Sequence, residues 1–167
     1  VTLSENAEIT GSVSGDAFGD LLQFNTTSLV LQDFAEIASN TTGSGVGGTI
    51  DINTTDFHIQ DRAGITAETL TPGEGDAGLI EIDASNFVMA GGLIITNTKS
   101  AGVGGTVEVL ADTIRIENDG AIKSDSLSGG DGGAIILTAR DSFTLSNAGI
   151  EAVTRGSGAG GRILIQA

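Results

Sequence analysis

The sequence predicts an all-β fold: a right-handed parallel β-helix, or solenoid, of about six turns with three short strands in each turn. Three observations predict it. Apolar and polar residues alternate in short segments, these segments recur about every 28 residues, and a glycine-rich stretch precedes each recurrence. Alternation with a period of two is typical of strands. The right hand is the usual one for parallel crossovers.

The first strand of each turn follows a pair of small residues. Gly47-Gly48 is the first complete pair, and equivalents follow it at intervals of 30, 27, 28 and 28 residues. An apolar-x-apolar triplet comes after every pair: Ile50/Ile52, Ile80/Ile82, Val107/Val109, Ile135/Leu137 and Ile163/Ile165. Leu22/Phe24 occupy the same place one repeat earlier, where Asp20 replaces the second glycine. Each triplet therefore predicts a strand with its apolar side facing inward.

The second and third strands follow from two further recurring patterns. The second strand is predicted by the triplets Val1/Leu3, Leu29/Leu31, Phe57/Ile59, Phe87/Met89, Ile114/Ile116 and Phe143/Leu145. The third strand is predicted by single inward residues: Ile9, Ile37, Ile65, Ile95, Ile122 and Ile150. Neighbouring side chains of a strand point to opposite faces, so the third strand is expected to present Ala38, Thr66, Thr96, Lys123 and Glu151 outward.

A corner is expected between the second and third strands. Its equivalent residues are Asp33, Asp61, Gly91, Asn118 and Asn147, which are types that tolerate the left-handed conformation. Stacking each strand beside its equivalent in the next turn buries the apolar faces in one continuous interior.

The whole chain, residues 1–167, reads as a single β-helix segment. Turns are less regular in residues 1–42 and regular in residues 43–167. The segment begins in a second strand and ends in a first strand, with no polar cap apparent at either end. We therefore expect a fragment of a longer repeat protein, or a unit that stacks end to end, because uncovered sheet edges favour pairing.

Composition narrows the class of protein. The chain has 26 glycines, one proline, no cysteine and a net charge of −15. The hydrophobic share of 39% is too high for a disordered chain. The acidic balance argues against nucleic acid as a partner, and no apolar run is long enough to insert into a membrane.

The repeat resembles that of a known family. Gly104–Val109, Ile114–Ile116 and Gly120–Ser126 carry the pattern, and it returns in Gly132–Leu137, Phe143–Leu145 and Gly149–Thr154. This pattern is similar to the repeats of filamentous haemagglutinin-type proteins, the exoproteins of two-partner secretion, and most similar to the cyanobacterial versions. The resemblance implies a right-handed β-helix that is secreted, works in adhesion or surface structure, and lies outside the cell at the outer membrane.

One acidic column is the candidate site. The outward residues of the first strand are expected to stack as Gln23, Asp51, Glu81, Glu108, Ile136 and Leu164, with Asp83 close by on the same face. Asp51, Glu81, Asp83 and Glu108 are therefore weak calcium candidates. The alternatives are a solvated acidic face, or a paired-carboxylate active site of a glycosidase-like enzyme.

No residue is assigned as catalytic or cofactor-binding, and the chain is not expected to be an enzyme. His58, the single histidine, has no evident partner and reads as a surface residue. The favoured hypothesis is a structural or adhesive stalk, whose partners are the rest of a longer chain, end-to-end copies, or a host or neighbouring-cell surface. The alternatives are a β-helical polysaccharide lyase or hydrolase that uses Asp51, Glu81 and Glu108, and a self-assembling building block.

Overall fold

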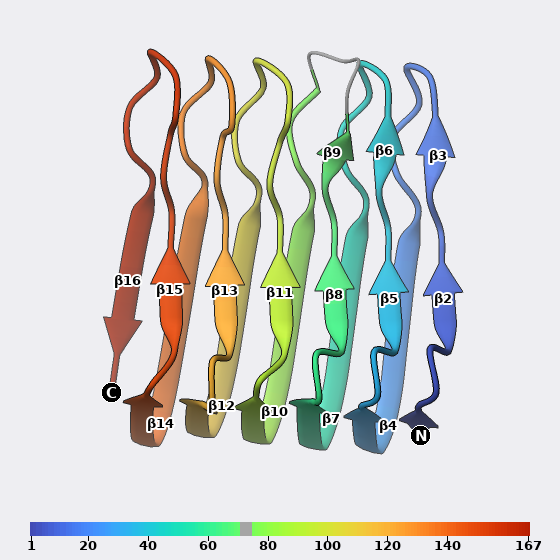
Figure 1. The fold of residues 1–167 in the computed structure, drawn as a ribbon. Coiled ribbons are helices and arrows are strands. Elements are labelled where there is room, and N and C mark those ends of the chain that lie inside the picture. The colour runs from blue at the N-terminus through green and yellow to red at the C-terminus, as the bar shows by residue number, and fades with distance from the viewer. Residues whose placement is uncertain (71–74) are drawn as a thin grey trace.

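A computed structural model describes residues 1–70 and 75–167, and these residues form a right-handed parallel β-solenoid of about six turns. In Figure 1 the chain rises along the front strands, descends along the back strands and moves one strand further from the N-terminus with each turn. The described residues contain strands and turns but no helix. The predicted fold class is confirmed.

The largest sheet combines the first and second predicted strands. Its seven strands pair in parallel in the order β1-β4-β7-β10-β12-β14-β16. Their bounds are Thr2–Leu3, Leu21–Leu31, Thr49–Gln60, Leu79–Ala90, Thr106–Glu117, Ala134–Ser146 and Arg162–Gln166. The two predicted segments of a turn are thus continuous in one long strand, which curves around one edge of the solenoid (Figure 1).

Two smaller sheets complete each turn. The six-stranded sheet contains β2 (Glu8–Thr10), β5 (Glu36–Ala38), β8 (Gly64–Thr66), β11 (Leu93–Ile95), β13 (Ala121–Lys123) and β15 (Gly149–Glu151). The three-stranded sheet contains β3 (Val13–Ser14), β6 (Thr41–Thr42) and β9 (Thr69–Leu70). Isolated parallel bridges continue it through Thr98, Ser126 and Thr154.

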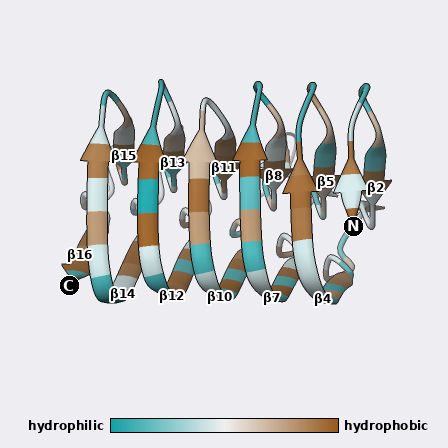
Figure 2. Ribbon diagram, turned by 90° about the horizontal axis from the view of Figure 1, so that it is seen from below, coloured by the Kyte–Doolittle hydropathy of each residue, from teal (hydrophilic) through white to brown (hydrophobic). Residues whose placement is uncertain are grey.

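The core is a stack of the predicted inward side chains. Bands of hydrophobic and hydrophilic residues alternate along the long strands (Figure 2), as expected when successive side chains face opposite sides. Leu29, Ile52 and Ile80 are fully buried. Phe57 and Phe87 lie in adjacent turns with ring centroids 5.6 Å apart and planes tilted by 55°, a favourable geometry for aromatic pairs.

The corner after the long strand is built from left-handed residues, as predicted. Four corners have two such residues in succession: Glu5-Asn6, Asp33-Phe34, Asp61-Arg62 and Asn118-Asp119. The other two corners have one each, Gly91 and Asn147. Side chains as large as those of Phe34 and Arg62 adopt the conformation, so the second left-handed position was not evident from residue type.

The prediction that Ile95 points inward is wrong, and so is the prediction that Thr96 points outward. Ile94 pairs with Ile65 and Ile122 and is fully buried, and Thr96 is buried as well. The cause is the shorter corner at Gly91. It brings the third strand forward by one residue, and a shift of one residue exchanges the two faces of a strand.

The last short corner does not shift the core. The register of β14 against β12 shifts between Ala111 and Thr113, where β14 has one extra residue. The corner at Asn147 then has one residue fewer, and Ile150 pairs with Ile122 as predicted. The added and the missing residue compensate each other within one turn.

The glycine-rich corner closes each turn by packing backbone directly on backbone. A Cβ at Gly102 would lie closer than 3.0 Å to the carbonyl oxygen of Gly75 in the preceding turn, and a Cβ at Gly130 would meet Gly102 in the same way. Backbone hydrogen bonds also join successive corners, for example from Gly104 N to Asp131 O at 3.0 Å. This spacing leaves no room for a Cβ at these glycine positions.

Buried hydroxyl groups hold the glycine-rich corner against the interior. Thr41 donates to the carbonyl of Val46 at 2.9 Å, and Ser126 donates to Gly102 at 3.1 Å. Thr69 donates to the carbonyl of Asp76 in its own turn, as Thr41 does to Val46. Thr98 and Thr154 donate to the carbonyls of Gly75 and Gly130 in the preceding turn, as Ser126 does to Gly102. From Thr41 onward, each turn therefore has an inward hydroxyl that donates to a carbonyl of the glycine-rich corner.

The inward side chains of the last turn are partly exposed. Ile163 and Ile165 of β16 are exposed by 44% and 42%, whereas the equivalent Ile135 and Leu137 one turn earlier are fully buried.

Candidate functional site

The acidic column forms in the predicted register. Parallel pairing places Gln23 beside Asp51, Asp51 beside Glu81, and Glu81 beside Glu108. The column continues through Ile136 to Leu164. Because all of these pairs are parallel and in register, the column follows directly from the 28-residue repeat. The acidic residues lie on β7, β10 and β12, and the apolar ones on β14 and β16.

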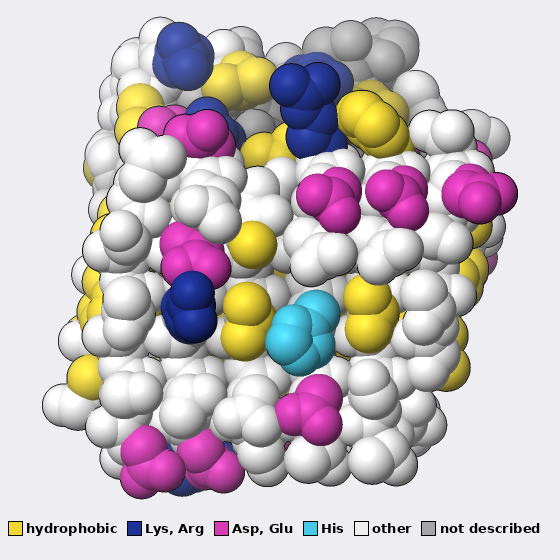
Figure 3. Space-filling model, turned by 60° about the horizontal axis from the view of Figure 1, so that its bottom comes forward, with side chains coloured by type: hydrophobic (Ala, Val, Ile, Leu, Met, Phe, Trp, Pro, Cys, Tyr) yellow, Lys and Arg dark blue, Asp and Glu magenta, His cyan; other side chains and the backbone are white. Residues whose placement is uncertain are grey.

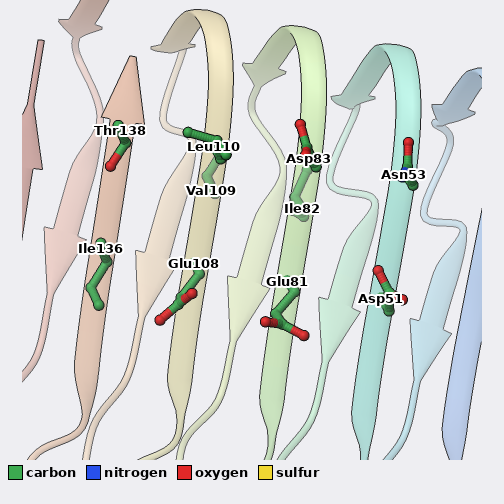
Figure 4. Close-up of a pocket in the computed structure, with 10 residues that line it drawn as sticks. All are labelled: Asp51, Asn53, Glu81, Ile82, Asp83, Glu108, Val109, Leu110, Ile136 and Thr138. Atoms are coloured by element: carbon green, nitrogen blue, oxygen red, sulfur yellow. The ribbon is translucent and has the colours of Figure 1, made fainter. Parts of the chain in front are cut away.

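Asp83 lies in the neighbouring column. It pairs with Asn53 on one side and with Leu110 on the other. Figure 4 shows Asp51, Glu81 and Glu108 at the same level of three consecutive strands, with Asp83 and Asn53 further along theirs. Together with Leu110, Ile136 and Thr138 they line a shallow hollow of about 400 Å³.

The carboxylates of the column are open to water. Glu81, Asp83 and Glu108 are exposed, and Asp51 is half-buried and accepts a hydrogen bond from Gln23 Nε2 at 2.7 Å. Side-chain repulsion between such groups is screened by water and salt, so the column needs no bound ion in order to exist.

A metal centre is not assembled in the part of the chain that the structure describes. No group of three or more His, Asp or Glu side chains there is arranged to hold a metal ion. Asp51, Glu81, Asp83 and Glu108 are neighbours on one open face, and Ca²⁺ needs six to eight oxygen ligands around it. Weak calcium binding at this column stays a prediction.

Charge is distributed unevenly along the solenoid. Residues 1–83 include 14 acidic side chains and one basic one, whereas residues 84–167 include eight acidic and six basic ones. Within the described residues, the ion pairs Arg115–Glu117, Lys123–Glu151 and Arg140–Asp112 all lie in the second half, at 2.8 to 3.0 Å. The N-terminal half is therefore the strongly acidic part.

His58 lies on the outer face of the long strands, between Val30 and Val88 (Figure 3). It is half-buried by these neighbours, which offer neither a proton acceptor nor a metal ligand. Arg115 follows Val88 in the same column and forms its ion pair with Glu117. The position agrees with the prediction of a surface residue.

Two phenylalanines at corners are exposed. Phe18 is exposed by 78% and Phe34 by 57%. The guanidinium group of Arg62 lies 5.9 Å from the centre of the Phe34 ring, which is a cation–π distance. The structure thus gives Phe34 a neighbour from the next turn.

A second polar column lies where the six-stranded and three-stranded sheets meet. Asn40 Oδ1 accepts the backbone N–H of Glu68 at 2.8 Å, Asn97 Oδ1 accepts that of Asp125, and Asp125 Oδ1 accepts that of Val153. Each side chain caps the residue 28 positions later in the sequence. This column was not predicted from the sequence. The spacing of Asn40, Glu68, Asn97 and Asp125, at intervals of 28, 29 and 28 residues, is the signal that could have indicated it.

Glu68 is the titratable group of this column with a perturbed pKa. Burial raises the pKa of Glu68 above its usual value of 4.5, Lys99 opposes the rise, and Glu36 adds to it. Glu36 also accepts a hydrogen bond from Thr66 Oγ1 at 2.9 Å. A half-buried carboxyl beside one cation and one anion is a stability feature as readily as a functional one.

Comparison of the chain with protein-family models, with curated proteins and with solved structures finds no match. The described residues include no helix that could span a membrane. The functional interpretation therefore depends on the geometry of the solenoid and on the resemblance of its repeats.

Proposed function

We propose that this chain is a rigid stalk segment of a secreted or cell-surface exoprotein, with a structural or adhesive role rather than a catalytic one. The observation that carries the proposal is the continuous register of the large sheet. From β4 to β14, the inward and outward columns pass from turn to turn with one local shift, at the extra residue of β14.

Stiffness follows from this arrangement. Backbone hydrogen bonds run parallel to the solenoid axis in all three sheets and in the glycine-rich corner. Bending the axis would stretch these bonds on one side and compress packed backbone on the other. Such a solenoid suits a role in which one part of a protein is held at a fixed distance from another.

The adhesive and extracellular part of the proposal is supported by the resemblance of the repeats to those of filamentous haemagglutinin-type exoproteins. The partners would be other parts of the same long chain and a host or neighbouring-cell surface. The acidic outer face keeps a particle rich in β-structure soluble, which a surface stalk requires.

The stalk role is tested by lengthening the chain. Duplicating residues 106–133, a full repeat of 28 residues, should insert one turn and lengthen the solenoid axis by about 4.8 Å, which increases the maximum dimension in small-angle scattering. Two and three copies should add proportionally. A matched insertion with Gly130 and Gly133 both changed to Ala should fail to extend the particle, because the corner cannot stack. A dimension that does not grow with the number of repeats would contradict the stalk proposal.

The enzyme alternative is tested separately. Reducing-sugar release from pectin, alginate and similar polymers should stay at the level of a blank reaction. Turnover that the chain supports and that is lost in Glu81→Gln would overturn the non-catalytic proposal, because Glu81 occupies the centre of the acidic column.

A further inference from the structure

Two columns of the glycine-rich corner are occupied by glycine in every turn except the first. Ala17 begins one column and Asp20 begins the other. The residues that follow Ala17 are Gly45, Gly75, Gly102, Gly130 and Gly158, and those that follow Asp20 are Gly48, Gly78, Gly105, Gly133 and Gly161. Both exceptions, Ala17 and Asp20, therefore lie in the same turn.

The glycines of both columns have the same physical cause. At each of the ten positions, a Cβ would lie closer than 3.0 Å to a carbonyl oxygen of the same column in the preceding turn. The first turn has no turn stacked before it in the structure, so Ala17 and Asp20 carry a Cβ without this clash. A turn placed there with the same geometry would meet both side chains.

The first turn has a second adaptation to Asp20. A Cβ at Gly48 would also collide with the hydroxyl group of Ser39, which lies inward of it. In the first turn the residue equivalent to Ser39 is Gly11, which has no side chain. Gly11 and Asp20 thus replace Ser39 and Gly48 as a pair, and the side chain of Asp20 has room inside its own turn.

In other respects the two end faces are complementary. Continuing the columns would place Ile165 of one copy beside Phe24 of the next, and Leu164 beside Gln23. Residues 1–20 include four acidic side chains and no basic one, whereas residues 149–167 include Arg155, Arg162 and one acidic residue. Partly exposed isoleucines and opposite charges therefore favour head-to-tail contact between copies, and the glycine-rich corner alone opposes it.

We infer that Ala17 and Asp20 block head-to-tail stacking of this chain, and that the C-terminal face fits only a turn with glycine in both columns. Ala17 and Asp20 thus exclude a second copy from the N-terminal face, whereas Gly158 and Gly161 carry no Cβ in the corresponding columns of the C-terminal face. This inference goes beyond the proposed stalk role and does not depend on adhesion or secretion, so either can fail without the other.

The first experiment restores the missing glycines. The natural chain should sediment as a monomer, and Ala17→Gly/Asp20→Gly should give an average mass that rises at least twofold with concentration. The matched control is Ser14→Gly/Asp16→Gly, which removes one acidic charge from the same corner outside the two columns and should stay monomeric. Association of the control to the same degree, or a monomeric double variant, would contradict the inference.

The second experiment traps the contact covalently and needs no change at the corner. The chain has no cysteine, so Gln23→Cys and Leu164→Cys introduce the only two thiols. These positions lie at opposite ends of one column, about five strand spacings or 24 Å apart, and reach each other only between stacked copies. Oxidation should leave the chain monomeric in the unchanged background and give a ladder of linked multimers together with Ala17→Gly/Asp20→Gly.

A control places the first thiol one turn further in, as Asp51→Cys with Leu164→Cys, which should not link even in the glycine background. Linked multimers of Gln23→Cys/Leu164→Cys in the otherwise unchanged chain would overturn the inference, whether or not the glycine variant folds.

Discussion

The solenoid turns through two kinds of corner, and they use glycine in opposite ways. At the corner after the long strand, nine residues other than glycine have positive φ, from 49° at Asn147 to 65° at Asp119. At the glycine-rich corner, most of the described glycines have ordinary φ values but no space for a Cβ. The first corner is limited by backbone conformation and the second by the distance between turns. A small energetic cost can be tolerated in the first case, whereas a steric clash cannot be tolerated in the second.

The largest expected effect comes from placing a methyl group at the crowded corner. Gly130→Ala should lower the free energy of unfolding by about 3 kcal/mol, at the upper end for overpacking, because the Cβ meets the carbonyl of Gly102. Gly149→Ala is the matched control, since a Cβ there has no atom within 4 Å. It should change stability by no more than about 0.5 kcal/mol. Urea denaturation measures the free energy of unfolding of both variants. Equal losses would contradict the steric explanation of the glycine-rich corner.

A smaller effect is expected from removing a hydroxyl group that supports the crowded corner. Ser126→Ala leaves the carbonyl of Gly102 without its side-chain partner and should cost about 1–2 kcal/mol. Ser126→Thr should retain most of the stability, because Thr98 and Thr154 occupy the same column. If Ala and Thr are equally tolerated in denaturation experiments, the hydroxyl group contributes nothing to the corner.

The left-handed corner should be more tolerant. Asn118→Ala should destabilise the chain by about 1 kcal/mol, because alanine adopts the left-handed conformation at a steric cost. Asn118→Gly should stay within about 0.5 kcal/mol of the natural residue. A cost for Asn118→Ala that equals that of Gly130→Ala would contradict the comparison between the two corners.

The pH dependence should reveal Glu68. Because burial raises its pKa in the folded state, ionising Glu68 destabilises the fold at neutral pH, and this penalty is lost as the pH falls through the raised pKa. Glu68→Gln should therefore be more stable than the natural chain at pH 7, and the difference should disappear below the usual value of 4.5. Thermal melting at several pH values measures this. A difference that grows in acid would mean that the sign of the shift is wrong.

The smallest effect is expected at the acidic column. Millimolar Ca²⁺ should raise the melting temperature slightly in the natural chain and not in Glu81→Gln, if the column binds calcium weakly as predicted from its sequence. Mg²⁺ at the same concentration is the control for general screening of charge. No heat in calorimetry and no change in melting would remove the calcium hypothesis.

Most of the fold could be predicted from the sequence because the repeat fixes the register. Once Ile52 and Ile82 are aligned, parallel pairing places every outward residue, and the column of Asp51, Glu81 and Glu108 follows. The error at Ile95 arose because glycine at residue 91 suits a corner with one left-handed residue as well as a corner with two. Only the pairing of Ile94 decides between them.

The polar columns were harder to predict because their hydrogen bonds join residues of different turns. Asn40 accepts a hydrogen bond from the backbone N–H of Glu68, so the type of side chain at residue 68 does not reveal the contact. The raised pKa of Glu68 likewise depends on burial and on the charges of Lys99 and Glu36, which belong to the two adjacent turns. Alternation along a strand says which way a side chain points but not how deeply its neighbours cover it.

The compensated turn around β14 has a consequence for how such a chain tolerates insertions and deletions. One residue is added beside Ala139 and one is missing at Asn147, yet Ile150 keeps its place. The corner therefore loses the residue that the strand gains, so the register of the next sheet does not change. An engineer who wishes to insert a residue into a long strand should remove one from the corner that follows, and a lineage of such repeats can change length by paired small steps without rebuilding its interior.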